Sequence, residues 1–143
     1  NEPDIAYPYL YNFLKGKEWK TQQKVDQLIN EYFQNKPAGL PGNEDTGVMS
    51  AWLIYGMAGF YPITPAEPNY TFSSPKFTKI TLKRNPQYYP AGDLVIESNA
   101  SPENIYIKNI YIDGKPYKSY FISHDALKNA KKIRFELISK LGN

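Results

Sequence analysis

The stretch Gly39-Leu40-Pro41-Gly42-Asn43-Glu44-Asp45-Thr46-Gly47-Val48-Met49-Ser50-Ala51-Trp52 joins a polar, glycine-rich loop to an apolar segment. Glycine and proline around Asn43, Glu44 and Asp45 predict turns on both sides of these residues. Residues 48–57 are apolar enough for a buried helix, which Asp45 or Thr46 is placed to cap. The simplest interpretation is that the acids only cap this helix. The alternative is that two adjacent carboxylates beside an amide serve a cation, a proton or a ligand.

Composition limits the classes of protein to which the chain can belong. Its 143 residues, 41% of them hydrophobic, suffice for one ordinary domain or two small packed pieces. A net charge of +3 without a basic run gives no support for nucleic-acid binding. The absence of cysteine excludes disulfides and thiolate metal sites, and the single histidine, His124, excludes a histidine-rich zinc site. No apolar run approaches the ~20 residues of a membrane span. Asn1-Glu2-Pro3 is not a signal peptide, and a start without Met fits a processed product or a fragment.

The first 60 residues carry helical patterns. Residues 7–14 are densely apolar, and Pro8 suits an early helical turn. Residues 22–34 repeat apolar side chains on one face, with Thr21 as the expected N-cap. A third helix is expected over residues 46–59 and is apolar nearly all round. Three helices of this kind cannot close a core alone, so this half is expected to be a slice of a larger helical assembly.

The period of the hydrophobic pattern changes after Gly59. Strands are expected over residues 70–72, 79–83, 93–97, 105–112, 117–122 and 132–137. Asp113-Gly114 predicts a two-residue hairpin turn, and residues 123–127 predict a capped single turn. The predicted fold class is α+β: an N-terminal helical segment over residues 1–60 and an antiparallel β-sandwich-like region over residues 61–143.

Other polar clusters are less specific. Asn1-Glu2-Pro3-Asp4 is either a terminus in which Asp4 caps a helix or a second acidic loop that meets the first one. Oxygen ligands of this kind suit calcium rather than zinc. His124 and Asp125 favour a structural turn over an acid–base pair. Trp19 and Trp52 suit packing, although Trp19 follows a polar loop and is placed to face a ligand.

Five blocks of the sequence together resemble glycoside hydrolase family 92, bacterial exo-acting α-mannosidases. In chain order these blocks are Asn1-Glu2-Pro3-Asp4 with Tyr9-Leu10-Tyr11-Asn12, then Trp19-Lys20-Thr21-Gln22, residues 39–47, Met49-Ser50-Ala51-Trp52, and Gly59-Phe60-Tyr61-Pro62. The resemblance covers essentially the whole chain but only the last part of the family's catalytic region. It implies that residues 1–60 close an (α/α)₆ barrel and that the β-rich remainder packs on it.

The resemblance also implies a mechanism that is inverting and calcium-dependent. Inversion needs a general acid and a general base separated by roughly 6.5–9.5 Å. Asp45 matches the base, and Asn43 matches a position that many members fill with a second, supporting carboxylate. Asn1 and Glu2 match the region that helps to bind Ca²⁺. Glu44 and Trp19 are the predicted substrate-binding residues.

Two departures from the family pattern bear on function. Ile5 and Ala6 stand where many members have a pair of histidines, so contacts made by imidazoles at a substrate subsite are missing. The family's general acid lies upstream of this motif and outside the chain. The sequence therefore predicts an inactive fragment of an active, secreted or periplasmic mannosidase, whose partners are a mannose-containing glycan and the remainder of the parent polypeptide. The alternative is a non-catalytic carbohydrate-binding or interaction module.

Overall fold

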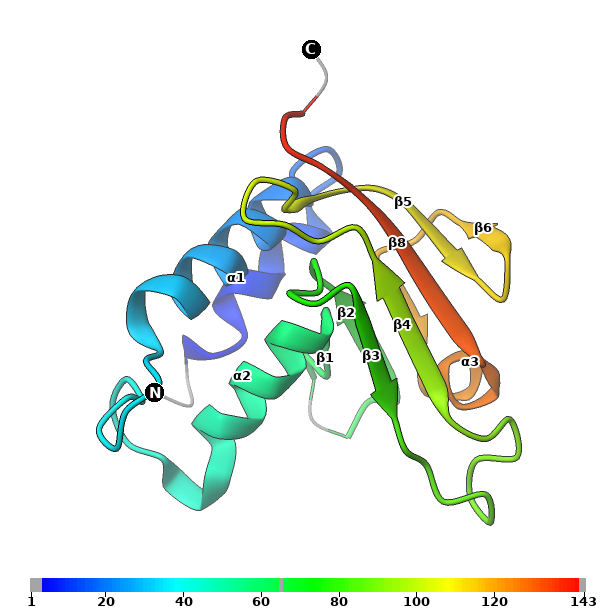
Figure 1. Cartoon of the computed structure of the whole chain (residues 1–143), viewed down its shortest axis with the longest axis horizontal. Coiled ribbons are helices and arrows are strands. Elements are labelled where there is room, and N and C mark those ends of the chain that lie inside the picture. Colours follow the sequence, from blue (N-terminus) through cyan, green and yellow to red (C-terminus); the bar gives the residue numbers. More distant parts are fainter. Residues whose placement is uncertain (1–3, 65, 142–143) are drawn as a thin grey trace.

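The computed structural model describes residues 4–64 and 66–141. Helices precede strands along the chain (Figure 1). The helical part contains the 3-10 helices η2 (Tyr7–Phe13) and η3 (Asp45–Gly47) and the α-helices α1 (Trp19–Tyr32) and α2 (Val48–Ala58). The strands are β1 (Phe60–Tyr61), β2 (Asn69–Phe72), β3 (Lys79–Leu82), β4 (Leu94–Ser98), β5 (Tyr106–Ile112), β6 (Lys115–Tyr117), β7 (Phe121–Ser123) and β8 (Lys132–Ile138), with α3 (His124–Asn129) between the last two. The α+β class predicted from the sequence is confirmed.

The start of α1 differs from the prediction. The helix begins at Trp19, and Thr21 is buried inside it instead of capping it. The reason is a preceding turn that continues into the helix: the N–H groups of Lys20 and Thr21 donate to the carbonyls of Lys17 and Glu18. Backbone acceptors therefore bind the donors that a capping side chain would otherwise satisfy. The predicted buried face is present, with Val25 and Ile29 in the core.

The strands form two sheets. β1, β2 and β7 make an antiparallel three-stranded sheet, and the order β3-β4-β8-β5-β6 makes a five-stranded sheet in which β4 and β8 are parallel. The parallel pair was not expected from the sequence. Residues 117–122, expected as one strand, are divided: the chain leaves the larger sheet after Tyr117 and enters the smaller one at Phe121. The Asp113-Gly114 hairpin is confirmed, and both residues have positive φ.

Two clusters of buried side chains hold the structure together. One joins the strands to the end of α2, and its most buried members include Phe72, Ile96, Ile133 and Phe135. The other lies among the helices, and its buried members are Tyr9, Val25, Ile29, Trp52 and Tyr61.

Buried polar contacts tie the helical part to the strands. Asn12 Nδ2 donates to Thr71 Oγ1 (2.5 Å) and to the carbonyl of Phe72 (2.8 Å). The N–H of Ile107 in β5 donates to Gln22 Oε1 in α1 at 2.8 Å. The helical part ends at Gly59, close to the predicted boundary. These hydrogen bonds join residues on both sides of that boundary. The division into two domains stays a prediction.

Candidate active-site loop

The acidic loop lies between α1 and α2, and glycine is required where the chain turns. The N–H of Gln34 donates to the carbonyl of Gly39 at 2.8 Å, and a Cβ at Gly39 would lie only 1.8 Å from Gln34 O. Gly42, with φ of 78°, makes a second turn in the left-handed region. The chain then presents Asn43 and Asp45, which are both exposed.

Glu44 takes the capping role that was expected of Asp45 or Thr46. Neither of those side chains caps α2, whereas Glu44 Oε1 accepts the N–H of Ser50 at 3.2 Å. A carboxylate at this position satisfies one free amide of the first helical turn and is attracted by the positive end of the helix dipole. The other oxygen, Oε2, is buried and has no hydrogen-bond partner among the described residues.

Asp45 is followed by two successive residues in the left-handed conformation. Thr46 has φ 55° and ψ 24°, and Gly47 has φ 87° and ψ 10°. A β-branched residue at positive φ is a genuine outlier, and the left-handed conformation costs a non-glycine residue about 1–2 kcal/mol. The carbonyl of Glu44 holds the turn by accepting the N–H groups of Gly47 and Val48, each at 3.0 Å. Strain of this kind is concentrated at functional sites, where the surrounding structure maintains it.

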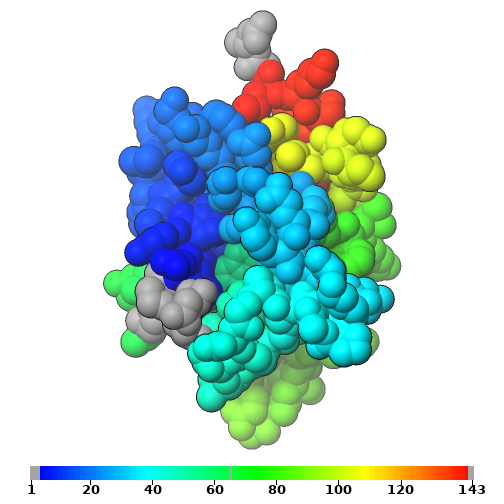
Figure 2. All heavy atoms as spheres, turned by 90° about the vertical axis from the view of Figure 1, so that its left-hand side faces the viewer, coloured from blue at the N-terminus to red at the C-terminus, as the bar shows by residue number. Residues whose placement is uncertain are grey.

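The start of the described chain lies against the same helix. Trp52 Nε1 donates to the carbonyl of Ile5 at 2.9 Å. Asp4 and Ile5 line a small pocket of about 210 Å³ together with Pro41 and Met49. Figure 2 shows this face, with the dark-blue start of the chain and the cyan-to-aquamarine loop both at the surface. Asp4 therefore lies near Pro41, which precedes the acidic residues, while a meeting of the N-terminal cluster with Asn43, Glu44 and Asp45 stays a prediction.

Trp19 lies away from this loop. It is the first residue of α1, and its ring packs edge-to-face on Tyr106 of β5 with a centroid separation of 6.4 Å. The acidic loop follows the other end of α1 (Figure 1). The 14 residues of this helix span roughly 20 Å. The structure therefore brings Asn43, Glu44 and Asp45 together but not Trp19, whose substrate contact stays a prediction.

The predicted metal ligands Asn1 and Glu2 lie outside the described residues. Within residues 4–64 and 66–141, no group of three or more His, Cys, Asp or Glu side chains is arranged to hold a metal ion. Nor does any helix in this described part have the length and apolar character needed to cross a membrane.

The other titratable residues considered from the sequence lie at a helix start, where their contacts are with other parts of the fold. His124 begins α3, where its Nδ1 lies 3.1 Å from the hydroxyl of Tyr70, and Ser123 Oγ caps this helix by accepting the N–H of Ala126. The capped turn expected at residues 123–127 is confirmed. A groove beside α2, lined partly by Tyr70 and His124, was not foreseen. The feature of the sequence that indicates such a groove is the apolar character of α2 on all sides.

Comparisons with known proteins agree with this architecture. Residues 1–139 match the glycosyl hydrolase family 92 catalytic domain. A family GH92 α-mannosidase from Bacteroides thetaiotaomicron, solved in complex with mannoimidazole, is 34% identical, with a TM-score of 0.89 over 98% of this chain. An inverting family GH92 mannosidase from the same organism is 30% identical, with a TM-score of 0.85 over 98% of the chain. A protein of Arthroderma benhamiae described as an uncharacterized secreted glycosidase is 26% identical over 96% of the chain.

The chain belongs to glycosyl hydrolase family 92. It spans about 18% of the length of each of these three relatives. The resemblance seen in the five sequence blocks is confirmed, and the chain corresponds to one part of the proteins that it matches.

Proposed function

We propose that the parent protein of this chain is an inverting, calcium-dependent exo-α-mannosidase that acts on glycans, and that Asp45 is its general base. The observation that carries the proposal is the exposed carboxylate of Asp45 on a strained left-handed turn just before α2. The similarity to two solved mannosidases, one of them described as inverting, supports this substrate class and stereochemistry.

The proposed reaction is direct displacement by water. The carboxylate of Asp45 removes a proton from a water molecule whose oxygen attacks the anomeric carbon of the terminal mannose. The bond from that carbon to the leaving oxygen breaks, and a general acid in another part of the parent protonates the leaving oxygen. Because water enters from the face opposite the leaving group, the anomeric configuration inverts. The chain alone supplies only one of the two groups and is therefore proposed to be inactive.

The two neighbours of Asp45 have different proposed roles. Asn43 is exposed beside the base and offers an amide where a second carboxylate would otherwise stand. Glu44 supports the turn through its contact with Ser50. The family resemblance is the basis for keeping Glu44 as a proposed substrate-binding residue.

Calcium is proposed as the cofactor, with Asn1 and Glu2 among its ligands. Carboxylate and amide oxygens are ligands that Ca²⁺ accepts, and the bound ion would supply positive charge to hold sugar hydroxyls. The hydrogen bond from Trp52 to the carbonyl of Ile5 holds Ile5, next to Asp4 in the chain, against α2, the helix that follows Asp45. We further propose a secreted or periplasmic location, by analogy with the relative described as secreted.

The proposal is tested by incubating the full-length parent with α-linked mannobioses of each linkage and following the products by NMR. Release of mannose that appears first as the β-anomer is the expected result. Retention of the α-anomer would overturn the inverting mechanism. If the folded protein binds a mannobiose but releases no mannose, the chain belongs to a carbohydrate-binding module instead.

A further inference from the structure

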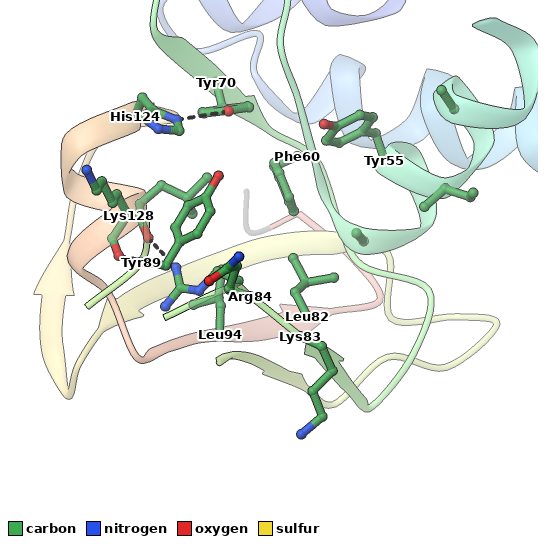
Figure 3. Close-up of a pocket in the computed structure, with 15 residues that line it drawn as sticks. Tyr55, Phe60, Tyr70, Leu82, Lys83, Arg84, Tyr89, Leu94, His124 and Lys128 are labelled. Carbon is green, nitrogen blue, oxygen red and sulfur yellow. Dashed lines mark hydrogen bonds between the residues drawn. The ribbon is translucent and has the colours of Figure 1, made fainter. Parts of the chain in front are cut away.

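A groove of about 490 Å³ runs along the side of α2, between this helix, the loop after β3 and the short helix α3 (Figure 3). It is separate from the acidic loop, and none of residues 43–45 lines it. Its floor is apolar: Tyr55 and Phe60 pack edge-to-face at 5.3 Å, and Leu82 and Leu94 lie on the opposite side.

The helix presents an uncovered apolar residue to this groove. Ile54 lines it and is 65% exposed, the largest exposed fraction among the large apolar side chains of the described chain. Burying such a side chain fully would contribute about 1.5–3 kcal/mol. Contiguous apolar surface of this kind marks a place where another protein surface binds.

The rim of the groove is positively charged. Lys83, Arg84 and Lys128 line it, and no Asp or Glu does. Two of these cations have partners within the chain: Lys83 pairs with Asp93 at 2.6 Å, and Arg84 donates to carbonyls at the end of α3. The Tyr70 hydroxyl at the same rim lies 3.1 Å from His124 Nδ1, and burial is the largest cause that raises the pKa of this phenol. The occupant is therefore expected to be apolar with an acidic group at its edge.

We propose that the groove binds an apolar segment, carrying at least one carboxylate, from the part of the parent polypeptide that lies outside this chain. The chain matches these relatives over 96–98% of its own length but only 18% of theirs, so each of them contains a large additional part that could supply the occupant of the groove. The groove borders the helix that Asp45 precedes. A segment seated there would hold the rest of the parent in a constant position relative to the base. This inference rests on family membership and not on the proposed reaction.

The test measures thiol reactivity in the full-length parent. Ile54→Cys introduces a thiol into the groove, and Tyr88→Cys is the matched control, because Tyr88 is 60% exposed and does not line the groove. The 143 residues contain no cysteine, so peptide mass spectrometry assigns each label within them without ambiguity. In the native parent, the thiol at position 54 is expected to react about 10–100-fold more slowly than the thiol at position 88, which corresponds to the free energy of burying one apolar side chain.

Equal reaction rates at the two positions would overturn the proposal. Protection at position 54 that disappears when the parent is diluted to a monomer would also overturn it, because the occupant would then be a second copy. Hydroxyl-radical footprinting of the wild-type parent gives the same comparison without a substitution, once each oxidation rate is divided by the intrinsic reactivity of its side chain: Ile54 is expected to be protected and Tyr88 oxidised. None of these readouts depends on glycosidase activity.

Discussion

Asp45 and Glu44 are adjacent acids with different surroundings. Glu44 is half-buried and satisfies the first turn of α2, whereas Asp45 is exposed at the start of a left-handed turn. Because the helix end is already capped by Glu44, the carboxylate of Asp45 remains available for chemistry. Substitution of Asp45 is therefore expected to affect activity, whereas substitution of Glu44 is expected to affect stability.

Asp45→Asn in the full-length parent is expected to lower kcat by about 10²–10⁴-fold, the usual contribution of a general base. The free energy of unfolding should change by no more than about 0.5 kcal/mol, as for an ordinary surface substitution. The measurement is steady-state mannose release together with thermal unfolding. Asp93→Asn, which removes an exposed carboxylate between β3 and β4, is the control and should leave kcat unchanged. Near-normal turnover of Asp45→Asn would remove this residue from the mechanism.

The helix α2 links the acidic loop to the strands. Its first turn follows the acidic loop, and its last residue, Ala58, belongs to the core of the strands. Gly59 ends the helix in the left-handed conformation, with φ of 88°, and its carbonyl accepts the N–H of Ser73 at 2.9 Å. Glycine is required there for a second reason, since a Cβ would lie 2.8 Å from Pro75 N.

Gly59→Ala is expected to destabilise the protein by about 2–4 kcal/mol, because left-handed strain of about 1–2 kcal/mol is added to a backbone clash. Gly92→Ala is the matched control: φ is 76° and nothing lies within 4 Å of its Cβ, so only the strain contributes. Chemical denaturation of both variants of the parent measures the difference between them. Equal losses would show that Pro75 moves aside at little cost.

The helical and β-rich parts contact each other through Asn12 and Gln22, but several large apolar side chains of the helical part stay exposed. Beyond Ile54, the exposed large apolar side chains of the helical part and its loops are Tyr7, Leu10, Phe13, Leu14, Tyr32 and Leu40. Exposed apolar surface of this kind favours association with another surface. The chain is therefore expected to self-associate when it is produced without the rest of the parent.

Removal of calcium is also expected to act on the whole parent. A chelator should abolish mannose release and lower the melting temperature, and added Ca²⁺ should restore both. Binding of the ion at 100 times its Kd contributes about 2.7 kcal/mol to stability, and calorimetry with and without the ion measures this shift. The double substitution Asn1→Ala with Glu2→Ala should remove the calcium-dependent part of the shift. An unchanged melting temperature in chelator would argue against a resident ion.

Local patterns in the sequence were sufficient for the class of fold. The α1 face of Val25 and Ile29, the alternation along β8 and the Asp113-Gly114 turn depend on contacts between near neighbours in the chain, so periodicity and turn chemistry predict them. The five sequence blocks were likewise sufficient for the family, which the comparisons confirm. The roles of Asp45, Asn43 and Trp19 stay predictions.

The tertiary structure decided what depends on partners that are distant in sequence. The parallel pairing of β4 with β8 and the transfer of the chain between sheets after Tyr117 follow from long-range packing that periodicity does not encode. Glu44 rather than Asp45 caps α2 because two left-handed residues turn the chain before the helix begins. The groove beside Ile54 exists because three elements from separate parts of the chain meet around a helix that is apolar on every side.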